Sequence, residues 1–435
     1  MRPLITIDNS MSNIVGLTKS QFDGLRNRLS YKVDAQAAYF SGYGPRIKYC
    51  IDKRGEFGTG LFHRVIEYLN ETDIDHSVHD KRVFSKGDTP IKLNLQVKPY
   101  PDQINAAEYA CVLGRGTISM PTGSGKSLVI ALIASRLNCR TLVIVPTLEI
   151  KRQLTASLNA ILGHTTNVVI ENIDSPKLKT LTEFDCLIID EAHHVAAKTY
   201  QKLNKTTWNK MCWRFFLTAT PFRNNTEETL LFESIADEVI YELDYETAVE
   251  RGYIVPIEAY YIEIPKQKTD AYTWAEVYRN LVVYNEQRNA ILATIMDNLH
   301  SNGVSALCLV KEIAHGKALE RLTSFKFVCG EDEESRDFIH QFNNGIQKVL
   351  IGTSGILGEG IDTKPAEYAI IAGLGKAKSA FMQQVGRVLR QYPGKKSGKV
   401  IIFKDKSHRF CSRHFKIQCD ILKEIYGVSP IKLDI

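Results

Sequence analysis

The segment that most constrains the fold is a glycine-containing stretch in the first third of the chain, Met120-Pro-Thr-Gly-Ser-Gly-Lys-Ser127. It follows a short strand-like run at 116–119 and opens a helical pattern at 128–135. Gly123 and Gly125 permit backbone angles that turn successive N–H groups inward, and a helix N-terminus adds partial positive charge. This order of strand, tight loop and helix predicts a phosphate-binding loop in an α/β fold.

The residue types of this loop suit a nucleoside triphosphate. Lys126 can reach the β- and γ-phosphates, the Ser127 hydroxyl can ligate Mg²⁺, and the preceding backbone cradles phosphate oxygens. Met120 stands where a strict P-loop begins with Gly, which leaves the phosphate-contacting residues unchanged. The alternative is a structural glycine turn, against which the surrounding strand and helix argue. We therefore expect ATP and Mg²⁺ as ligands, and the backbone cradle comprises Thr122, Gly123, Ser124 and Gly125.

A second segment, Cys186-Leu-Ile-Ile-Asp-Glu-Ala-His193, is an apolar strand that ends in two carboxylates. At the carboxyl edge of a parallel strand, Asp190 can hold Mg²⁺ through its water shell, and Glu191 can polarise the attacking water. Carboxylates at this place can also simply cap the next helix, but their pairing with the phosphate loop favours catalysis. We interpret His193 as a coupling residue, with a surface or core histidine as the alternative.

Two arginines lie in the later segment Gln383-Gln-Val-Gly-Arg-Val-Leu-Arg390. Helical spacing i, i+3 would place Arg387 and Arg390 on one face, where two guanidinium forks match triphosphate oxygens. Arginines supplied across a domain cleft stabilise the transition state of phosphoryl transfer and would tie hydrolysis to domain closure. The competing interpretation is a basic helix face that only binds DNA.

Short apolar runs alternate with helical stretches through most of the chain, which predicts two α/β domains with parallel sheets covered on both faces. The strand-like runs are 141–145, 185–189, 215–217, 306–310, 326–328, 349–351, 368–371 and 400–403. The first part reads as a small α+β unit, with strands at 5–14 and 46–51, helices at 20–29 and 61–69, and a proline-containing linker at 91–101. The expected domains are therefore 1–94, 95–240 and 241–435.

Charge is unevenly distributed along the chain. Residues 376–416 contain twelve Lys and Arg against the single acid Asp405, although the net charge of the whole chain is only +6. This concentration suggests a polyanionic partner, with a solvated basic tail as the alternative. The nine cysteines form no CxxC pair, and no apolar run approaches the roughly 20 residues needed to cross a bilayer. We expect a cytoplasmic protein with buried free thiols, no export signal and no membrane contact.

In their order and spacing, these segments resemble superfamily 2 helicases with a DEAH box across residues 98–405. The resemblance implies two tandem RecA-like P-loop NTPase domains. It assigns Gln103 to adenine, and Gly360 and Asp362 to the second-lobe motif near the ribose. It also implies coupling residues and nucleic-acid contacts: Thr218, Thr220 and Gln383 for coupling, and Pro146, Thr147, Arg223, Thr353 and Ser354 for contacts with the strand.

Within that superfamily the chain resembles phage UvsW-like branch-migration helicases, through 192–194, 220–223 and 311–317. The resemblance implies a monomeric ATP-dependent DNA helicase that moves 3′ to 5′ on forked or recombination-intermediate DNA, with recombination or replication proteins as partners. A double-strand translocase without strand separation, an RNA helicase, and a DNA-binding factor with a vestigial ATPase remain open.

Two regions outside the motifs are candidates for further DNA contacts. The basic turn with Arg46, Lys48, Lys53 and Arg54 predicts a duplex contact for the small N-terminal unit. An aromatic cluster in the second lobe is either a strand-separating wedge or part of that lobe's core and surface. Its members are Tyr260, Tyr261, Tyr272, Trp274 and Tyr278.

Overall fold

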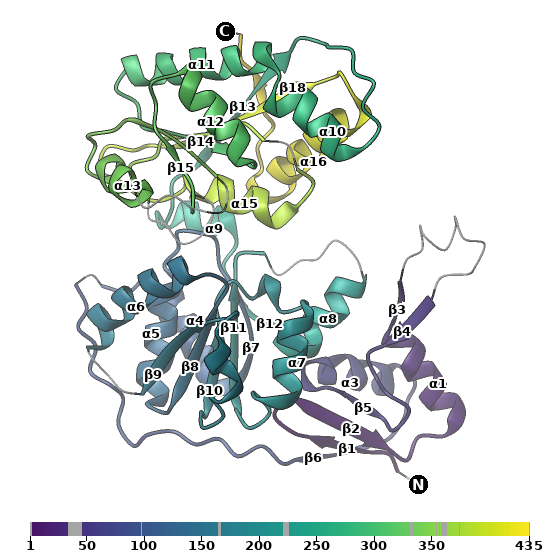
Figure 1. The fold of residues 1–435 in the computed structure, drawn as a ribbon. Coiled ribbons are helices and arrows are strands. Elements are labelled where there is room, and N and C mark those ends of the chain that lie inside the picture. Colours follow the sequence, from purple (N-terminus) through teal and green to yellow (C-terminus); the bar gives the residue numbers. More distant parts are fainter. Residues whose placement is uncertain are drawn as a thin grey trace. The chain divides into compact units, whose positions relative to one another are not determined.

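The computed structural model describes residues 2–33, 46–96, 98–163, 167–220, 226–330, 334–353, 355, 357, 363–373 and 375–434. The chain divides into two compact units (Figure 1). The first consists of residues 1–120 and 125–243, and the second of residues 121–124 and 244–435. Each unit contains a large parallel sheet, and the first also contains a smaller sheet near the N-terminus.

The smaller sheet has the order β5-β2-β1-β6, formed by Glu56–Gly58, Met11–Val15, Leu4–Ile7 and Ser77–Asp80. Strand β1 is antiparallel to β2 and parallel to β6. Helices α1 (Lys19–Arg28) and α3 (Phe62–Glu71) contribute Leu25, Val65 and Leu69 to its core. Strands β3 (Ser30–Val33) and β4 (Arg46–Tyr49) form a separate antiparallel ribbon.

Both helices predicted in this region are confirmed, but the strand predicted at 5–14 is wrong. The chain turns between β1 and β2, so the apolar residues on both sides belong to a hairpin. The N–H of Asn9 donates to the Asp8 carboxylate at 2.7 Å, and the Thr59 hydroxyl donates to the carbonyl of Asp8 at 2.8 Å. An aspartate that bonds the neighbouring backbone favours a turn, and it outweighs the apolar pattern here.

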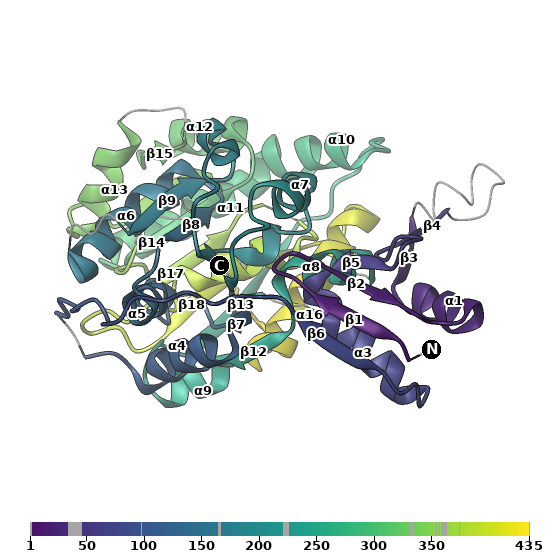
Figure 2. The ribbon, with the colours of Figure 1, turned by 90° about the horizontal axis from the view of Figure 1, so that it is seen from below.

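The large sheet of the first unit has the order β12-β7-β11-β10-β8-β9 and is parallel throughout. Its strands are Val239–Glu242, Arg115–Ser119, Trp213–Thr218, Cys186–Ile189, Thr141–Val145 and Val168–Asn172. Helices α4 (Pro101–Leu113), α5 (Lys126–Leu137) and α6 (Leu148–Leu162) pack side by side. Helices α7 (Lys198–Thr206) and α8 (Thr226–Ala236), both labelled in Figure 2, contribute side chains to a core cluster with β8, β10 and β11. The predicted parallel α/β sheet is confirmed.

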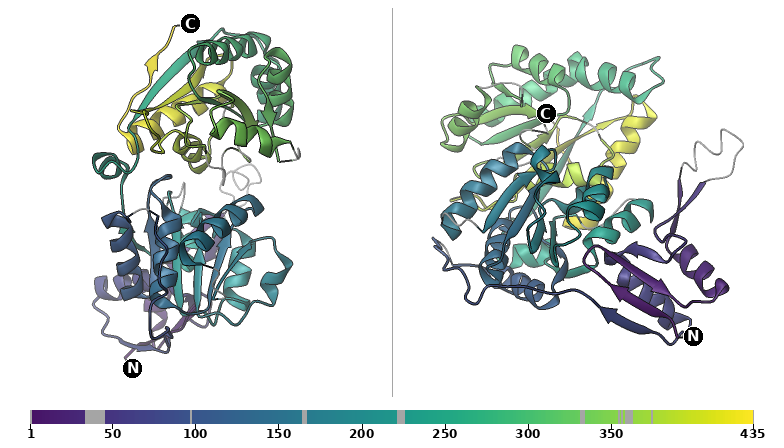
Figure 3. Two further views of the ribbon diagram at one scale, coloured as in Figure 1. Left: turned by 90° about the vertical axis from the view of Figure 1, so that its left-hand side faces the viewer. Right: turned by 60° about the horizontal axis from the view of Figure 1, so that its bottom comes forward.

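The second unit has a sheet of order β15-β16-β14-β17-β18-β13-β19, again parallel throughout. Its strands are Phe327–Val328, Val349–Thr353, Ala306–Val310, Tyr368–Ile371, Gly398–Asp405, Ile257–Ile264 and Ile431–Lys432. The longer helices are α11 (Glu286–Ser301), α12 (Ile313–Leu322), α13 (Ser335–Asn343), α15 (Lys378–Gly386) and α16 (Arg409–Tyr426). Figure 3 shows helices on both faces of this sheet. The short helices α9 and α10 span Tyr245–Glu250 and Trp274–Tyr278.

Two further sequence expectations concern side chains and membranes. All nine cysteines are free, and six of them, including Cys186 and Cys308 in strand-like runs, are buried, while the other three are half-buried. Within the described part of the chain, no helix combines the length and apolarity that a membrane span requires.

Candidate nucleotide site and helicase motifs

The predicted phosphate loop connects β7 to α5. The N–H of Met120 donates to the carbonyl of Thr218 at 3.0 Å, so the start of the loop is anchored to the end of β11. Gly123 and Gly125 have φ values of +91° and +84°, a region that residues with a side chain rarely adopt. The Ser124 hydroxyl donates to the carbonyl of Pro121 at 2.8 Å, which closes the turn.

Gln103 lies against this loop. A Cβ atom on Gly125 would come within 2.3 Å of Gln103 Nε2, so only glycine fits beside the amide. Gln103 belongs to the first turn of α4, is almost fully buried, and accepts a hydrogen bond from the N–H of Tyr100 at 2.9 Å. The glutamine predicted to read adenine is therefore held next to the glycine that opens α5.

The two predicted carboxylates follow β10. The N–H of Asp190 donates to the carbonyl of Ile144 at 2.9 Å, and its carboxylate accepts from the N–H of Glu191 at 3.0 Å. Burial and the neighbouring Glu191 charge raise the pKa of Asp190 to about 6, while Lys126 acts in the opposite direction. Glu191 has a φ of +49°, a strained conformation for a residue with a side chain. Such strain is typical of functional sites.

A contact with His193 distinguishes Glu191 from its neighbour. Burial acts to raise the pKa of Glu191, but His193 and Lys126 outweigh burial and lower that pKa to about 2. His193 Nδ1 lies 3.3 Å from Glu191 Oε2, and the rings of His193 and His194 are 4.1 Å apart. The carboxyl of Glu191 is therefore held ionised, while burial disfavours the charge of Asp190.

This arrangement fits a magnesium nucleotide. Lys126, which donates to the carbonyl of Met120 at 3.3 Å, acts electrostatically on both Asp190 and Glu191. A buried and a half-buried carboxylate at the carboxyl end of a parallel strand, beside a phosphate loop, suit a hard divalent cation. Asp190 and the Ser127 hydroxyl are the residues that would hold it. Bound Mg²⁺ would neutralise charge on the phosphates.

Thr218 and Thr220 connect the phosphate loop to the end of β11. The carbonyl of Thr218 accepts from Met120, and its hydroxyl accepts from the N–H of Thr220 at 3.0 Å. Both threonines are buried. The structure thus brings together six predicted positions in the first unit: Gln103, Lys126, Asp190, Glu191, Thr218 and Thr220.

The structure gives little support for the predicted contacts between the first unit and a nucleic-acid strand. Pro146 and Thr147 directly follow β8. The Thr147 hydroxyl accepts from the N–H of Ile150 at 3.2 Å and so caps α6, which is a structural role of its own. Arg223 lies outside the described residues.

In the second unit, the helical spacing predicted for the two arginines is wrong. Helix α15 ends at Gly386, and Arg387 begins a turn. Arg390 pairs with Ile254 in an antiparallel bridge, and the N–H of Val255 donates to the carbonyl of Leu389 at 2.8 Å. The N–H groups of Arg387, Val388 and Leu389 donate to the carbonyls of Gln384, Val385 and Gly386, so a turn separates the α-helix from the bridge at Arg390. The two arginines therefore do not belong to one α-helix. Their catalytic roles stay a prediction.

The other predicted positions of the second unit are only partly described. Gln383 lies buried in α15, and Arg387 is also buried. Thr353 is half-buried at the end of β16. Ser354, Gly360 and Asp362 lie outside the described residues.

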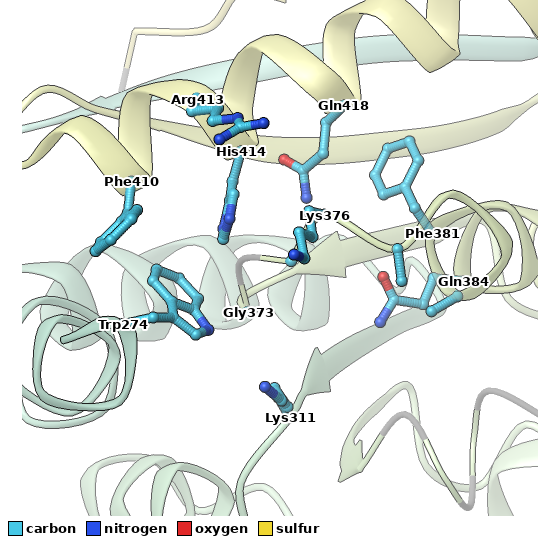
Figure 4. A pocket seen from close by; sticks show the side chains of 13 residues that line it. Trp274, Lys311, Gly373, Lys376, Phe381, Gln384, Phe410, Arg413, His414 and Gln418 are labelled. Atoms are coloured by element: carbon cyan, nitrogen blue, oxygen red, sulfur yellow. The ribbon is translucent and has the colours of Figure 1, made fainter. Parts of the chain in front are cut away.

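Sequence reasoning missed a cavity in the second unit, lined by Trp274, Phe410 and His414 (Figure 4). Trp274 belongs to the aromatic cluster considered as a wedge, but Tyr278 of that cluster is buried and Tyr272 is exposed. The only sequence signal for the cavity was helical i, i+4 spacing of Phe410 and His414. That spacing cannot identify Trp274 as their neighbour.

Two parallel α/β units, with a phosphate loop between β7 and α5 and an Asp-Glu pair after β10, define a P-loop NTPase with tandem domains. Residues 96–181 and 170–223 match the family described as "Type III restriction enzyme, res subunit", and residues 281–392 match "Helicase conserved C-terminal domain". The chain therefore belongs to the superfamily 2 helicases, a class of ATP-hydrolysing enzymes.

Individual relatives are distant. The chain is 26% identical over 341 residues to a protein named as a helicase in Sulfolobus islandicus filamentous virus, covering 67% of this chain and 60% of the relative. It is 23% identical over 369 residues to the ATP-dependent DNA helicase uvsW of Enterobacteria phage T4, covering 76% and 71%. This chain therefore spans only 60% of the length of the Sulfolobus virus protein.

The fold also matches solved structures. One is a fragment of a type I restriction enzyme HsdR subunit from Vibrio vulnificus, with a TM-score of 0.58 and 18% identity. The match covers 92% of this chain and 81% of the fragment. At this identity the likeness supports the α/β fold and carries nothing about substrate.

Proposed function

We propose that this protein is an ATP-dependent DNA helicase that unwinds or branch-migrates forked and recombination-intermediate DNA. The observation that carries the proposal is a phosphate loop whose Lys126 acts electrostatically on both Asp190, which is buried, and Glu191, which is half-buried. In this proposal residues 95–240 and 241–435 are the two motor domains, and residues 1–94 form a DNA-binding domain.

The first unit supplies most of the hydrolytic chemistry. The loop backbone and Lys126 hold the phosphates, Gln103 holds adenine, and Ser127 and Asp190 position the cation. Glu191, kept ionised by its environment, orients the attacking water and accepts its proton. Arg387 and Arg390 supply positive charge to the transition state from the second motor domain.

Coupling to DNA follows from how the loop is anchored. Met120 hydrogen-bonds to Thr218, and Thr218 hydrogen-bonds to Thr220, so a displacement of the phosphate loop is transmitted to the end of β11. His193 contacts Glu191 and provides a second route, and Gln383 acts from the second domain. Such connections allow the change from bound ATP to bound ADP to alter the affinity for a DNA strand.

DNA is the substrate that the observations favour. A motor that steps along any sequence must hold phosphates, and the stretch 376–416 is strongly basic. The phage relative's printed name, ATP-dependent DNA helicase, supports the same substrate. Pro146, Thr147, Arg223, Thr353 and Ser354 are the proposed backbone contacts. The 3′ to 5′ direction and the monomeric state follow from the resemblance.

A substrate panel tests the proposal. Forked DNA, a four-way junction, a nicked duplex and a forked RNA duplex are incubated with ATP, and strand displacement is measured. We expect displacement on forks and junctions and none with Lys126→Ala. Displacement of a triplex-forming strand from intact duplex, without unwinding of forks, would instead identify a double-strand translocase. Displacement confined to the RNA duplex would contradict the assignment of DNA.

A further inference from the structure

The second unit contains a cavity of about 510 Å³ that the nucleotide site does not use (Figure 4). It lies at the carboxyl ends of β14 and β17, where Lys311 directly follows the first strand and Gly373 is the second residue after the other. These strands are neighbours, yet the chain continues from β14 to one side of the sheet and builds β17 and β18 on the other. In parallel α/β sheets such a switch point is where ligands bind.

Aromatic rings form one wall of the cavity. The ring of Trp274 contacts that of His414 at 4.3 Å and 68°, and that of Phe410 at 6.0 Å and 81°. Both partners lie on one face of α16, a turn apart. These edge-to-face contacts fix the orientation of the indole, which is only half-buried. The wall thus offers a fixed, partly accessible aromatic surface.

Two buried polar atoms lie beside this wall without a partner. Gln418 is 2% exposed and His414 is 6% exposed. Within the described part of the chain, neither Gln418 Oε1 nor His414 Nδ1 has a hydrogen-bond partner. Both residues line the cavity, and Figure 4 shows the Gln418 amide directed from α16 toward it. Because buried polar atoms are normally satisfied, these two call for a ligand with polar groups.

The charge around the cavity is positive. Lys311, Lys376 and Arg413 line it, and all three act together with burial to lower the pKa of His414. No Asp or Glu is among the described residues of its lining. Three exposed cations around an aromatic wall favour an anionic ligand that carries a ring.

We propose that this cavity holds one unstacked nucleotide of a bound nucleic-acid strand, a step that rests on the proposed function. The base stacks against Trp274, its polar edge meets Gln418 and His414, and the flanking phosphates lie at Lys311, Lys376 and Arg413. A cavity of this size accommodates a nucleotide. Three separate cations match the successive phosphates of a strand better than the single phosphate group of a free mononucleotide. Stacking of this kind tolerates any base, as a motor requires.

The test compares two ligands of equal length and charge, a fluorescent oligo-dT and its abasic sugar–phosphate analogue. We expect Trp274→Ala to weaken binding of oligo-dT by about tenfold, the scale of one base–aromatic stack, and to leave the abasic ligand unchanged. Gln418→Leu, which keeps the packing volume, should show the same selectivity more weakly. Tyr272→Ala is the matched control, because Tyr272 is exposed and does not line this cavity.

Arg413→Ala should behave differently from the aromatic variant. The substitution should weaken the binding of both ligands equally. It should also reduce the salt dependence of binding by roughly 0.7 log units per log of salt, as for the loss of one phosphate contact. Equal weakening of both ligands by Trp274→Ala and by Gln418→Leu would overturn the base pocket. Competition by thymidine monophosphate at the same nucleotide concentration would also overturn it, because the cavity would then serve a free nucleotide. Failure of the wild-type protein to bind either oligomer would count against the proposed function itself.

Discussion

Arg64 of α3 and Glu233 of α8 form a two-pronged ion pair, in which Arg64 Nη2 lies 2.7 Å from Glu233 Oε1 and Nε donates to Oε2. A second pair, Arg115 with Asp237, is buried beside it at 2.5 Å. Leu230 of α8 also belongs to the hydrophobic core of the small N-terminal sheet. The small N-terminal sheet and its helices are therefore packed against α8 of the same unit through both apolar and charged contacts.

His63 should make this packing depend on pH. Burial acts to lower the pKa of His63, but Asp237 and Glu233, 3.6 and 3.8 Å from its ring, outweigh burial and raise that pKa above the usual 6.5. The raised pKa means that the stabilisation is fully present below pH 6.5 and is lost as pH rises through the folded-state value. Urea unfolding should show His63→Gln less stable than wild type at pH 5.5. The difference should shrink by pH 9, and a constant difference would contradict this account.

Substitutions in the exposed strand β4 test whether the proposed N-terminal domain binds forked DNA. Deleting residues 1–91 would expose Leu230, so a point substitution is cleaner than truncation. Arg46 and Lys48 are exposed. The double substitution Arg46→Glu and Lys48→Glu should weaken fork binding and flatten its salt dependence, while ATPase activity on single-stranded DNA is retained. Lys19→Glu is the charge-reversal control on α1. Unchanged fork affinity and salt slope would leave the domain with only a structural role.

Glu191→Gln should separate nucleotide binding from turnover. The substitution keeps the size of the side chain but removes the carboxylate that accepts a proton, so turnover should fall by roughly 10²–10⁴-fold. Binding of a fluorescent ATP analogue with Mg²⁺ should be retained, and the variant should remain on DNA in the ATP-bound state. Turnover at the wild-type rate would remove Glu191 from the mechanism.

Arg387→Ala and Arg390→Ala should each lower ATP turnover by roughly 10³-fold or more, with a smaller change in ATP affinity, because their charge acts in the transition state. Lys396→Ala serves as the control, since Lys396 is an exposed cation of the same basic segment. Steady-state kinetics with and without DNA provide the measurement. A loss confined to DNA affinity would favour a basic surface over catalytic arginines.

The sequence predicted best where local pattern and burial agree. The runs 141–145, 306–310 and 368–371 coincide with β8, β14 and β17, because buried parallel strands need continuous apolar residues. The phosphate loop was predictable because its glycines, lysine and serine are contiguous. In contrast, the pairing of Arg64 with Glu233 joins residues 169 positions apart, and Trp274 meets His414 across a comparable distance in sequence. Contacts between residues so far apart in the chain leave no local sequence pattern from which they could be predicted.

The error at Arg390 has a similar origin. The residues around Gly386 have a helical pattern, but the α-helix ends at Gly386, and Arg390 pairs with Ile254, more than a hundred residues earlier in the chain. Tertiary hydrogen bonds thus override local propensity, and only a structure reveals which side chains share a face.

ATP hydrolysis by the wild-type protein and by Lys126→Ala, each with and without single-stranded DNA, tests the central claim most directly. Lys126 acts on both Asp190 and Glu191, and it is proposed to hold the phosphates. We predict hydrolysis by the wild type that DNA stimulates, and none by Lys126→Ala although it still binds DNA. Hydrolysis by Lys126→Ala at the wild-type rate, or a wild-type protein that binds DNA without hydrolysing ATP, would contradict the assignment of an ATP-driven motor.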